Sequence, residues 1–147
     1  MYLLDTNHCS AAILGDANLL RRIAEVENSL ITTCVIVQGE LVDMAERSQY
    51  KESNLDLIHR FLLGIYIYNI DASTATISGQ LKAALFNQFR PKDKSKQRKT
   101  KIVDLGFDEN DIWIAAIALQ NNLTVVSRDS DFLRIQQVRI FTLESWV

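Results

Sequence analysis

Tyr2-Leu3-Leu4-Asp5-Thr6-Asn7 opens with a short apolar run that stops at three residues able to cap a helix. An apolar run of this length, bounded by polar residues, is typical of a buried β-strand. An aspartate, threonine or asparagine directly after it favours the start of a helix. The stretch therefore predicts a strand that leads straight into a helix, which is the repeating unit of an α/β fold.

The same alternation continues along the chain. Predicted helices cover residues 17–25, 35–47, 52–63, 72–89 and 108–121, with a short helical turn at 129–135. Predicted strands cover residues 29–33, 65–70, 123–126 and 138–143. Asp16, Asp71 and Asp108 stand where they would cap the helices that follow them. Because strands separated by helices cannot be joined as hairpins, the pattern predicts a mainly parallel central sheet flanked by helices.

Length and composition favour one compact domain over residues 1–147. The chain is 48% hydrophobic and 23% charged, a balance typical of globular proteins. Its longest apolar stretches, 62–70 and 112–119, are too short and too interrupted to cross a bilayer, and the amino terminus has no signal-peptide pattern. We therefore expect a cytoplasmic protein without a membrane partner. Cys9 and Cys34 lack metal-knuckle spacing, so we expect buried reduced thiols.

Basic residues gather in one segment, although the formal net charge is only −2. Residues 90–101 contain seven cations and one acid, so they carry about +6 and the remainder about −8. The cations are Arg90, Lys92, Lys94, Lys96, Arg98, Lys99 and Lys101. We expect residues 90–105 to form an exposed basic loop inserted in the domain. It would either contact the phosphates of a polyanion such as a nucleic acid or be a solvated surface loop.

Five acidic residues, in four segments of the chain, stand where one site would need them. Asp5 follows the first predicted strand, and Asp129 and Asp131 follow the strand at 123–126. The carboxyl ends of parallel strands meet at one edge of a sheet, where ligand sites form. Glu40 and Asp111 lie near helix starts, on the stripe that carries the apolar residues, where a lone carboxylate would be costly to bury.

Each acid also has a purely structural interpretation. Asp5 and Asp129 would cap the helical turns that follow them, and Asp111 would complete a capping box with Asp108. Glu40 would extend past the apolar surface to water. Taken singly, these interpretations are at least as good as a catalytic one. Taken together, two acids after strands and two near helix starts favour a shared site at one sheet edge.

Four segments, in order along nearly the whole chain, carry a family resemblance. They are Leu4-Asp5-Thr6-Asn7, Val37-Gln38-Gly39-Glu40-Leu41, Asn110-Asp111-Ile112-Trp113-Ile114-Ala115-Ala116 and Val126-Ser127-Arg128-Asp129-Ser130-Asp131-Phe132. This set resembles the PIN-domain toxins of the VapC type. The helix with Asp-x-x-Ile-Ala-Ala, followed by a strand and an Asp-x-Asp-Phe turn, is its most specific part.

The resemblance implies a PIN-like three-layer fold and a metal-dependent endoribonuclease acting as the toxin of a toxin-antitoxin pair. The implied acidic site is Asp5, Glu40, Asp111 and Asp129, with Asp131 as the alternative fourth acid. Asp5, Asp111 and Asp129 would hold Mg²⁺ or Mn²⁺, cations that prefer carboxylate oxygens to histidine or cysteine. Thr6 would orient Asp5 or bind a metal-bound water, Asn7 would help hold the same turn, and Ser127 would hydrogen-bond within the acidic loop.

The resemblance also implies products with a 5′-phosphate and a 3′-hydroxyl, structured RNA such as transfer RNA as substrate, a homodimer, and a small cognate antitoxin. Toxins of this type usually have a short connection before the Asp111 helix. Because this chain has a basic insertion there, the substrate preference of the family does not transfer directly to it. His8 fits a structural or solvent-facing residue better than a phosphate ligand, and His59 is interpreted as incidental. Trp113 fits core or dimer packing better than base stacking.

Two rival functions stay open at this point. A non-catalytic binding module on the same fold would use the acids to hold a structural cation or to cap helices. A receiver-like phosphoryl-transfer domain would need paired acids near the first strand and a lysine after a late strand. Asp5 stands alone on its strand and Arg128 is the cation near Asp129, so the receiver interpretation ranks below the other two.

Overall fold

The computed structural model describes the backbone of residues 1–147 and all side chains except that of Ser29. Its helices are α1 (Thr6–Ile13), α2 (Ala17–Glu25), α3 (Val35–Glu46), α4 (Lys51–Leu63), α5 (Ala72–Phe89), α6 (Lys94–Gln97), α7 (Glu109–Asn121) and α8 (Ser130–Ile135). Its strands are β1 (Tyr2–Leu4), β2 (Ile31–Cys34), β3 (Tyr66–Tyr68), β4 (Thr124–Val126) and β5 (Leu143–Glu144). Two 3₁₀ turns cover Asn28–Leu30 and Ile102–Leu105.

A five-stranded sheet in the order β3-β2-β1-β4-β5 forms the centre of the fold. Every pairing is parallel, so the prediction of an α/β fold with a mainly parallel sheet is confirmed. From β1 the chain first builds the side that holds β2 and β3, and then crosses back to place β4 on the other side of β1. The strand order thus reverses between β1 and β4, and this is where parallel sheets open a crevice for ligands.

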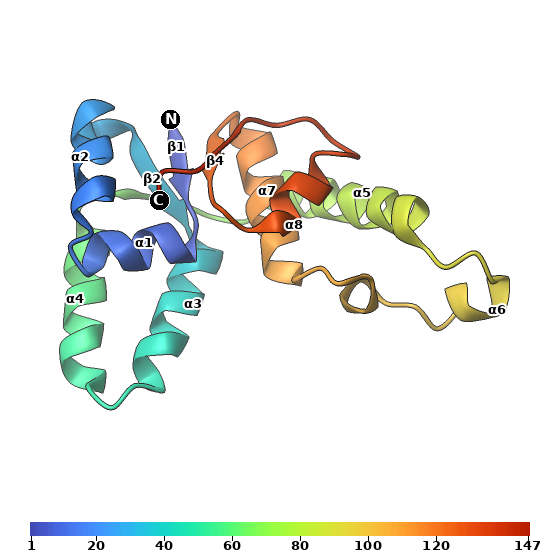
Figure 1. Ribbon diagram of the computed structural model, residues 1–147, viewed down its shortest axis with the longest axis horizontal. Coiled ribbons are helices and arrows are strands. Elements are labelled where there is room, and N and C mark those ends of the chain that lie inside the picture. The colour runs from blue at the N-terminus through green and yellow to red at the C-terminus, as the bar shows by residue number, and fades with distance from the viewer.

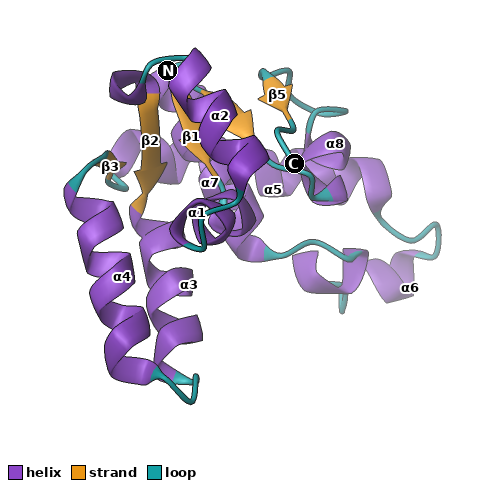
Figure 2. Cartoon of the chain, turned by 60° about the vertical axis from the view of Figure 1, so that its left-hand side comes forward, coloured by secondary structure: helices purple, strands orange, loops and turns teal.

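Helices surround the sheet in two groups (Figure 1). Helices α3 and α4 lie side by side and project from the sheet as a pair (Figure 2). Helices α5 and α7 pack against each other on the other side of the molecule. α7 is the most buried helix, because Ile112 and the run Ile114–Ala118 are all within the core. This burial holds its first turn, which carries Asp111, next to the sheet edge.

Local capping signals placed several helices correctly. The Asp16 and Asp71 carboxylates accept from the backbone N–H groups of Leu19 and Thr74, each at 2.9 Å. Asp108 accepts from Asn110 N–H at 2.8 Å, so all three predicted caps are confirmed. Most other predicted boundaries differ from the structure by one or two residues.

The final predicted strand forms, but it is shorter and begins later than predicted: it covers Leu143–Glu144 and not residues 138–143. The N–H groups of Val138 and Arg139 donate to Ile135 O at 3.1 and 3.2 Å, so these residues extend the turn after α8. Pairing with β4 begins only where Val125 N–H reaches Thr142 O at 2.9 Å. Alternating apolar residues favour a strand, but a strand forms only where a neighbour's hydrogen-bonding groups are within reach.

The basic segment 90–105 is more ordered than a plain loop. Asp93 accepts from Ser95 N–H at 2.9 Å and so starts the four-residue helix α6, and the 3₁₀ turn follows at Ile102–Leu105. Such a short helix buries none of its residues, which explains why apolar periodicity did not reveal it. The segment is largely exposed, and α6 lies at the opposite end of the molecule from α2 and α4 (Figure 1).

Cys9 and Cys34 are buried free thiols, as predicted, and burial raises the pKa of both. Trp113 is half-buried, with the Lys82 ammonium 5.7 Å from its ring centre. No described helix is both long enough and apolar enough to span a bilayer.

Candidate functional site

A cavity of about 390 Å³ gathers the acidic residues from four separate segments. Asp5 follows β1, Glu40 lies on α3, Asp111 lies in the first turn of α7, and Asp129 follows β4. The residues that line the cavity are Asp5, Thr6, Asn7, Glu40, Asp43, Met44, Asp108, Asn110, Asp111 and Asp129. The four acids that the sequence singled out therefore face one space.

Asp5 is held by three hydrogen-bond donors. It is only 5% exposed and caps α1. Its Oδ1 accepts from His8 N–H at 2.8 Å and lies 2.8 Å from His8 Nδ1, while its Oδ2 accepts from the Ser127 hydroxyl. Ser127 Oγ in turn accepts from Asp129 N–H at 3.0 Å, so one buried hydroxyl links the acids that follow β1 and β4.

Glu40 is held from two sides. Thr6 Oγ1 donates to Glu40 Oε2, and the Asn110 side-chain amide donates to Glu40 Oε1 at 2.8 Å. Glu40 therefore does not extend freely into water, which was its structural alternative. We expected Thr6 to orient Asp5 or bind a metal-bound water, but its hydroxyl donates to Glu40.

Asp111, Asp129 and Asp131 form a cluster in which one carboxylate oxygen of each lies within 4.8 Å of the others. Burial raises the pKa of Asp111 to about 8, and the neighbouring charges of Asp129, Asp108, Asp131 and Glu40 raise it in the same direction. Asp108 caps α7 through Asn110 N–H, so the structure shows no capping box between Asp108 and Asp111. The Asp111 carboxyl stands in an excess of negative charge.

Asp129 and Asp131 differ in what their oxygens already contact. Asp131 Oδ2 accepts from Asp108 N–H at 3.1 Å, and its Oδ1 lies 3.6 Å from Arg134 Nη1. Asp129 Oδ1 accepts from Asp131 N–H at 2.9 Å, and Asp129 lines the cavity. Asp131 thus braces the turn before α7, whereas Asp129 faces the space beside Asp111.

The other predicted residues divide between the cavity and the periphery. Asn7 is exposed on the cavity wall, and Ser127 is buried behind Asp5. Among the side chains that the structure describes, none of the seven cations of segment 90–101 lines this cavity. Their predicted contact with RNA is not tested by this geometry.

Sequence reasoning missed Asn110 as a partner of Glu40, and it treated Asp108 only as a cap. Asn110 directly precedes Asp111 at the start of the helix, and this adjacency was the one available signal. His8 was interpreted as structural or solvent-facing. The structure shows that the His8 imidazole is completely buried and that its Nδ1 lies within hydrogen-bond distance of the Asp5 carboxylate.

The oxygen atoms that line the cavity suit a hard divalent cation. The cavity acids offer carboxylate oxygens, the ligands that Mg²⁺ and Mn²⁺ prefer. Burial raises the pKa of Asp111 and the neighbouring carboxylates raise it further, and a bound cation would offset both effects. The carboxylates close enough together to share such a cation are those of Asp111, Asp129 and Asp131, and Asp5 lines the same cavity as Asp111 and Asp129.

Comparison with known proteins gives a consistent result. The PIN domain family model matches residues 2–138. A protein of Haemophilus influenzae called Ribonuclease VapC2 is 32% identical over 148 residues, covering 99% of this chain and 98% of that protein. A "tRNA(fMet)-specific endonuclease VapC" of Shigella flexneri is 33% identical over 90 residues, 61% of this chain and 68% of that protein.

Solved structures agree on the fold. VapBC2 from Rickettsia felis bound to a DNA fragment from its promoter matches with a TM-score of 0.76 and 24% identity, covering 99% of this chain and 98% of that one. DNA-bound VapBC from Salmonella typhimurium matches with a TM-score of 0.77 and 23% identity over the same shares.

Proposed function

This chain belongs to the PIN domain family, among its VapC-type members, and we propose that it is an endoribonuclease toxin of a toxin-antitoxin pair whose activity depends on Mg²⁺ or Mn²⁺. The observation that carries the proposal is the single cavity shared by Asp5, Glu40, Asp111 and Asp129. Hydrolysis of a phosphodiester needs an activated water and neutralisation of the phosphate, and such a cavity can provide both without a protein nucleophile.

Asp5, Asp111 and Asp129 would hold the cation. A divalent cation bound there supplies charge neutralisation and Lewis-acid activation of water and phosphate for in-line attack. Asp5 enters the cavity already oriented by His8 and Ser127. At neutral pH the metal-free Asp111 keeps its proton, because its pKa is about 8, so cation and proton compete for that carboxyl.

Glu40 takes the fourth catalytic position. Thr6 and Asn110 donate to its two oxygens, which holds the carboxylate on the cavity wall. A carboxylate fixed in this way can orient a water or accept its proton. As the family resemblance implies, water would attack the phosphorus and the P–O3′ bond would break, so that the 3′ oxygen leaves as a hydroxyl and the phosphate stays on the 5′ end.

The substrate would be RNA, with transfer RNA the first species to examine. Two relatives carry names that specify an endonuclease for initiator transfer RNA. The basic segment 90–105, which would be an insertion within one domain, would add phosphate contacts of its own. We further propose a homodimer, a small cognate antitoxin as partner, and the cytoplasm as the compartment.

The decisive experiment is cleavage of total bacterial RNA and of a transfer-RNA pool by the purified protein. We expect cutting in Mg²⁺ or Mn²⁺ that stops in chelator and is lost in Asp5→Asn. Asp56→Asn, on the exposed face of α4, is the matched control and should cut normally. Folded, antitoxin-free protein that binds Mn²⁺ but cuts neither RNA would contradict the proposal and favour a non-catalytic binding module.

The toxin role has its own test. Induced expression of the wild-type chain should arrest bacterial growth, and expression of Asp5→Asn to the same level should not. Arrest by both proteins would separate toxicity from the cavity and contradict this part of the proposal.

A further inference from the structure

His8 lies between Asp5 and the segment that follows β5, with both ring nitrogens engaged. Its side chain is completely buried. Nδ1 lies 2.8 Å from Asp5 Oδ1, and Trp146 N–H donates to Nε2 at 3.3 Å. The second contact joins residues 138 positions apart in the sequence. His8 thus connects the C-terminal segment directly to an acid of the cavity.

The direction of these hydrogen bonds follows from the donors available. A backbone N–H can only donate, so His8 Nε2 must accept from Trp146 and carries no proton. The proton of the neutral ring is then on Nδ1, the atom that faces Asp5 Oδ1. The Trp146 backbone therefore selects the tautomer in which His8 donates to Asp5.

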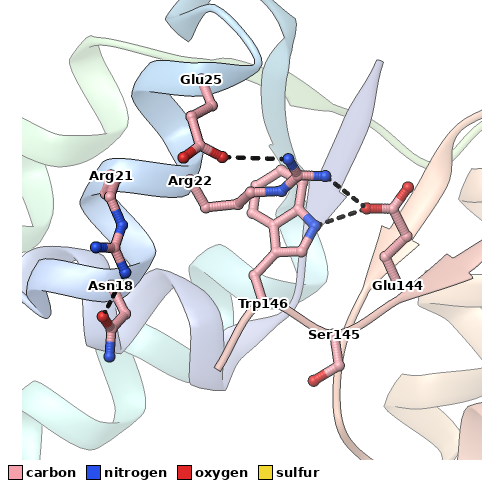
Figure 3. Close-up of a pocket in the computed structure, with 7 residues that line it drawn as sticks. All are labelled: Asn18, Arg21, Arg22, Glu25, Glu144, Ser145 and Trp146. Carbon is pink, nitrogen blue, oxygen red and sulfur yellow. Dashed lines mark hydrogen bonds and ion pairs between the residues drawn. The ribbon is translucent and has the colours of Figure 1, made fainter.

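Trp146 contacts side chains of α2, β1 and β5, and Figure 3 shows Arg22 and Glu144 beside its indole ring. Its indole N–H donates to Glu144 Oε2 at 2.7 Å, and the Arg22 guanidinium lies 5.5 Å from its ring centre. Arg22 also pairs with Glu144 at 3.7 Å, and the Tyr2 ring lies 4.8 Å from the indole. These contacts keep the Trp146 backbone N–H in place above His8.

We propose that His8 is a positioning residue for Asp5 and that the Trp146 backbone sets its orientation. A carboxylate has about four acceptor positions, and the two His8 donors and Ser127 fill three of those on Asp5. The carboxylate is thereby fixed in rotation, with one position left for a cation. This inference rests on the proposed function, because it assumes that Asp5 is a metal ligand.

Mn²⁺ binding, measured by electron paramagnetic resonance on the antitoxin-free protein, tests the inference without any RNA. Removal of a hydrogen-bond partner behind a metal ligand typically weakens metal binding about 10–100-fold. We expect His8→Leu to raise the Mn²⁺ Kd by such a factor. His8→Asn places an amide N–H near the position of Nδ1 and should restore binding to within about threefold of wild type. His59→Leu, at an exposed histidine on α4, is the control and should bind normally.

A second pair of variants isolates the Trp146 backbone. Trp146→Leu removes the indole but keeps the N–H, whereas Trp146→Pro removes both. We expect Trp146→Pro to bind Mn²⁺ several-fold more weakly than Trp146→Leu. The difference between these two variants tests whether the Trp146 backbone N–H orients His8, and it can be measured even if His8→Leu does not fold.

The inference is overturned if folded His8→Leu binds Mn²⁺ as tightly as wild type does. It is also overturned if His8→Asn binds Mn²⁺ as weakly as a folded His8→Leu, or if the two Trp146 variants have equal Mn²⁺ affinities. A wild-type protein that binds Mn²⁺ but cuts no RNA would overturn the proposed nuclease activity. The Mn²⁺ affinities of the His8 and Trp146 variants would still decide the His8 inference. A wild-type protein without measurable Mn²⁺ affinity would overturn both.

Discussion

The Asn110 side-chain amide donates a 2.8 Å hydrogen bond to Glu40 Oε1, joining the first turn of α7 to α3 across 70 positions of sequence. The other oxygen of Glu40 accepts from Thr6, so both are occupied by donors from different elements. Helices α3 and α7 are in contact, and this bond sets the position of the acid at their junction. Glu40 reaches the cavity in a defined orientation.

Loss of this bond should reduce cleavage. Hydrogen bonds to charged groups contribute about 1.5–3 kcal/mol, so we expect Asn110→Leu to lower kcat/KM for RNA roughly 10–100-fold. Asn87→Leu, on an exposed position of α5, should cleave normally. Circular dichroism must show both variants folded, and a folded Asn110→Leu with wild-type kcat/KM would argue against a catalytic role for Glu40.

The raised pKa of Asp111 predicts how stability depends on pH without metal. With a pKa of about 8 in the folded chain against 3.8 ordinarily, the native carboxyl keeps a proton that the unfolded chain has lost. Between about pH 4 and pH 8 the folded state binds more protons, so its stability falls as pH rises. In chelator, the Tm of Asp111→Asn should fall less with pH than the Tm of wild type, and at pH 8 the variant should melt at the higher temperature. In the presence of metal, the same variant should cleave no RNA.

Thermal melts at pH 5, 6.5 and 8 measure this effect, and about 2–4 °C is expected for each kcal/mol recovered in a chain of this size. Asp56→Asn should follow the wild-type pH profile. The prediction fails if Asp111→Asn melts below wild type at pH 8.

Asp129 and Asp131 should respond differently to the same substitution. Asn is also a good helix cap, so Asp129→Asn should keep α8 while weakening Mn²⁺ binding and cleavage more than tenfold. Asp131→Asn disturbs the contacts with Asp108 and Arg134 and should mainly lower Tm. A larger loss of Mn²⁺ affinity in Asp131→Asn than in Asp129→Asn would reverse the assignment of the fourth acid.

The basic segment should act on RNA binding and leave the chemical step unchanged. Replacing Lys94, Lys96 and Lys99 by Gln should raise KM and leave kcat unchanged. For single-stranded RNA, the slope of log affinity against log salt should fall by about 0.7 for each phosphate that the variant no longer neutralises. The control replaces Lys51, Arg60 and Arg139, cations outside this segment, by Gln. Equal salt slopes in the two triple variants would indicate a solvated loop without specific RNA contacts.

Caps and sites turned out to be compatible, although the sequence presented them as alternatives. Asp5 caps α1 and lines the cavity, and Asp129 caps α8 and lines it as well. The reason is geometric, since a helix that starts at the carboxyl end of a parallel strand has its cap at the sheet edge where ligands bind. A capping signal at such a position therefore does not count against a functional role. That residues 1–147 form one domain, and that these acids are catalytic, stay predictions.

The sequence by itself determined the alternation of strands and helices, the caps at Asp16, Asp71 and Asp108, and the acids that follow β1 and β4. These features depend on neighbours within a few residues, so local propensity and hydrophobic period are enough to predict them. Only the tertiary structure decided that β4 lies beside β1, which brings Ser127 to Asp5 across 122 positions. It also decided the bonds of Asn110 to Glu40 and of Trp146 to His8, because such contacts depend on strand order and helix packing, which local sequence does not encode.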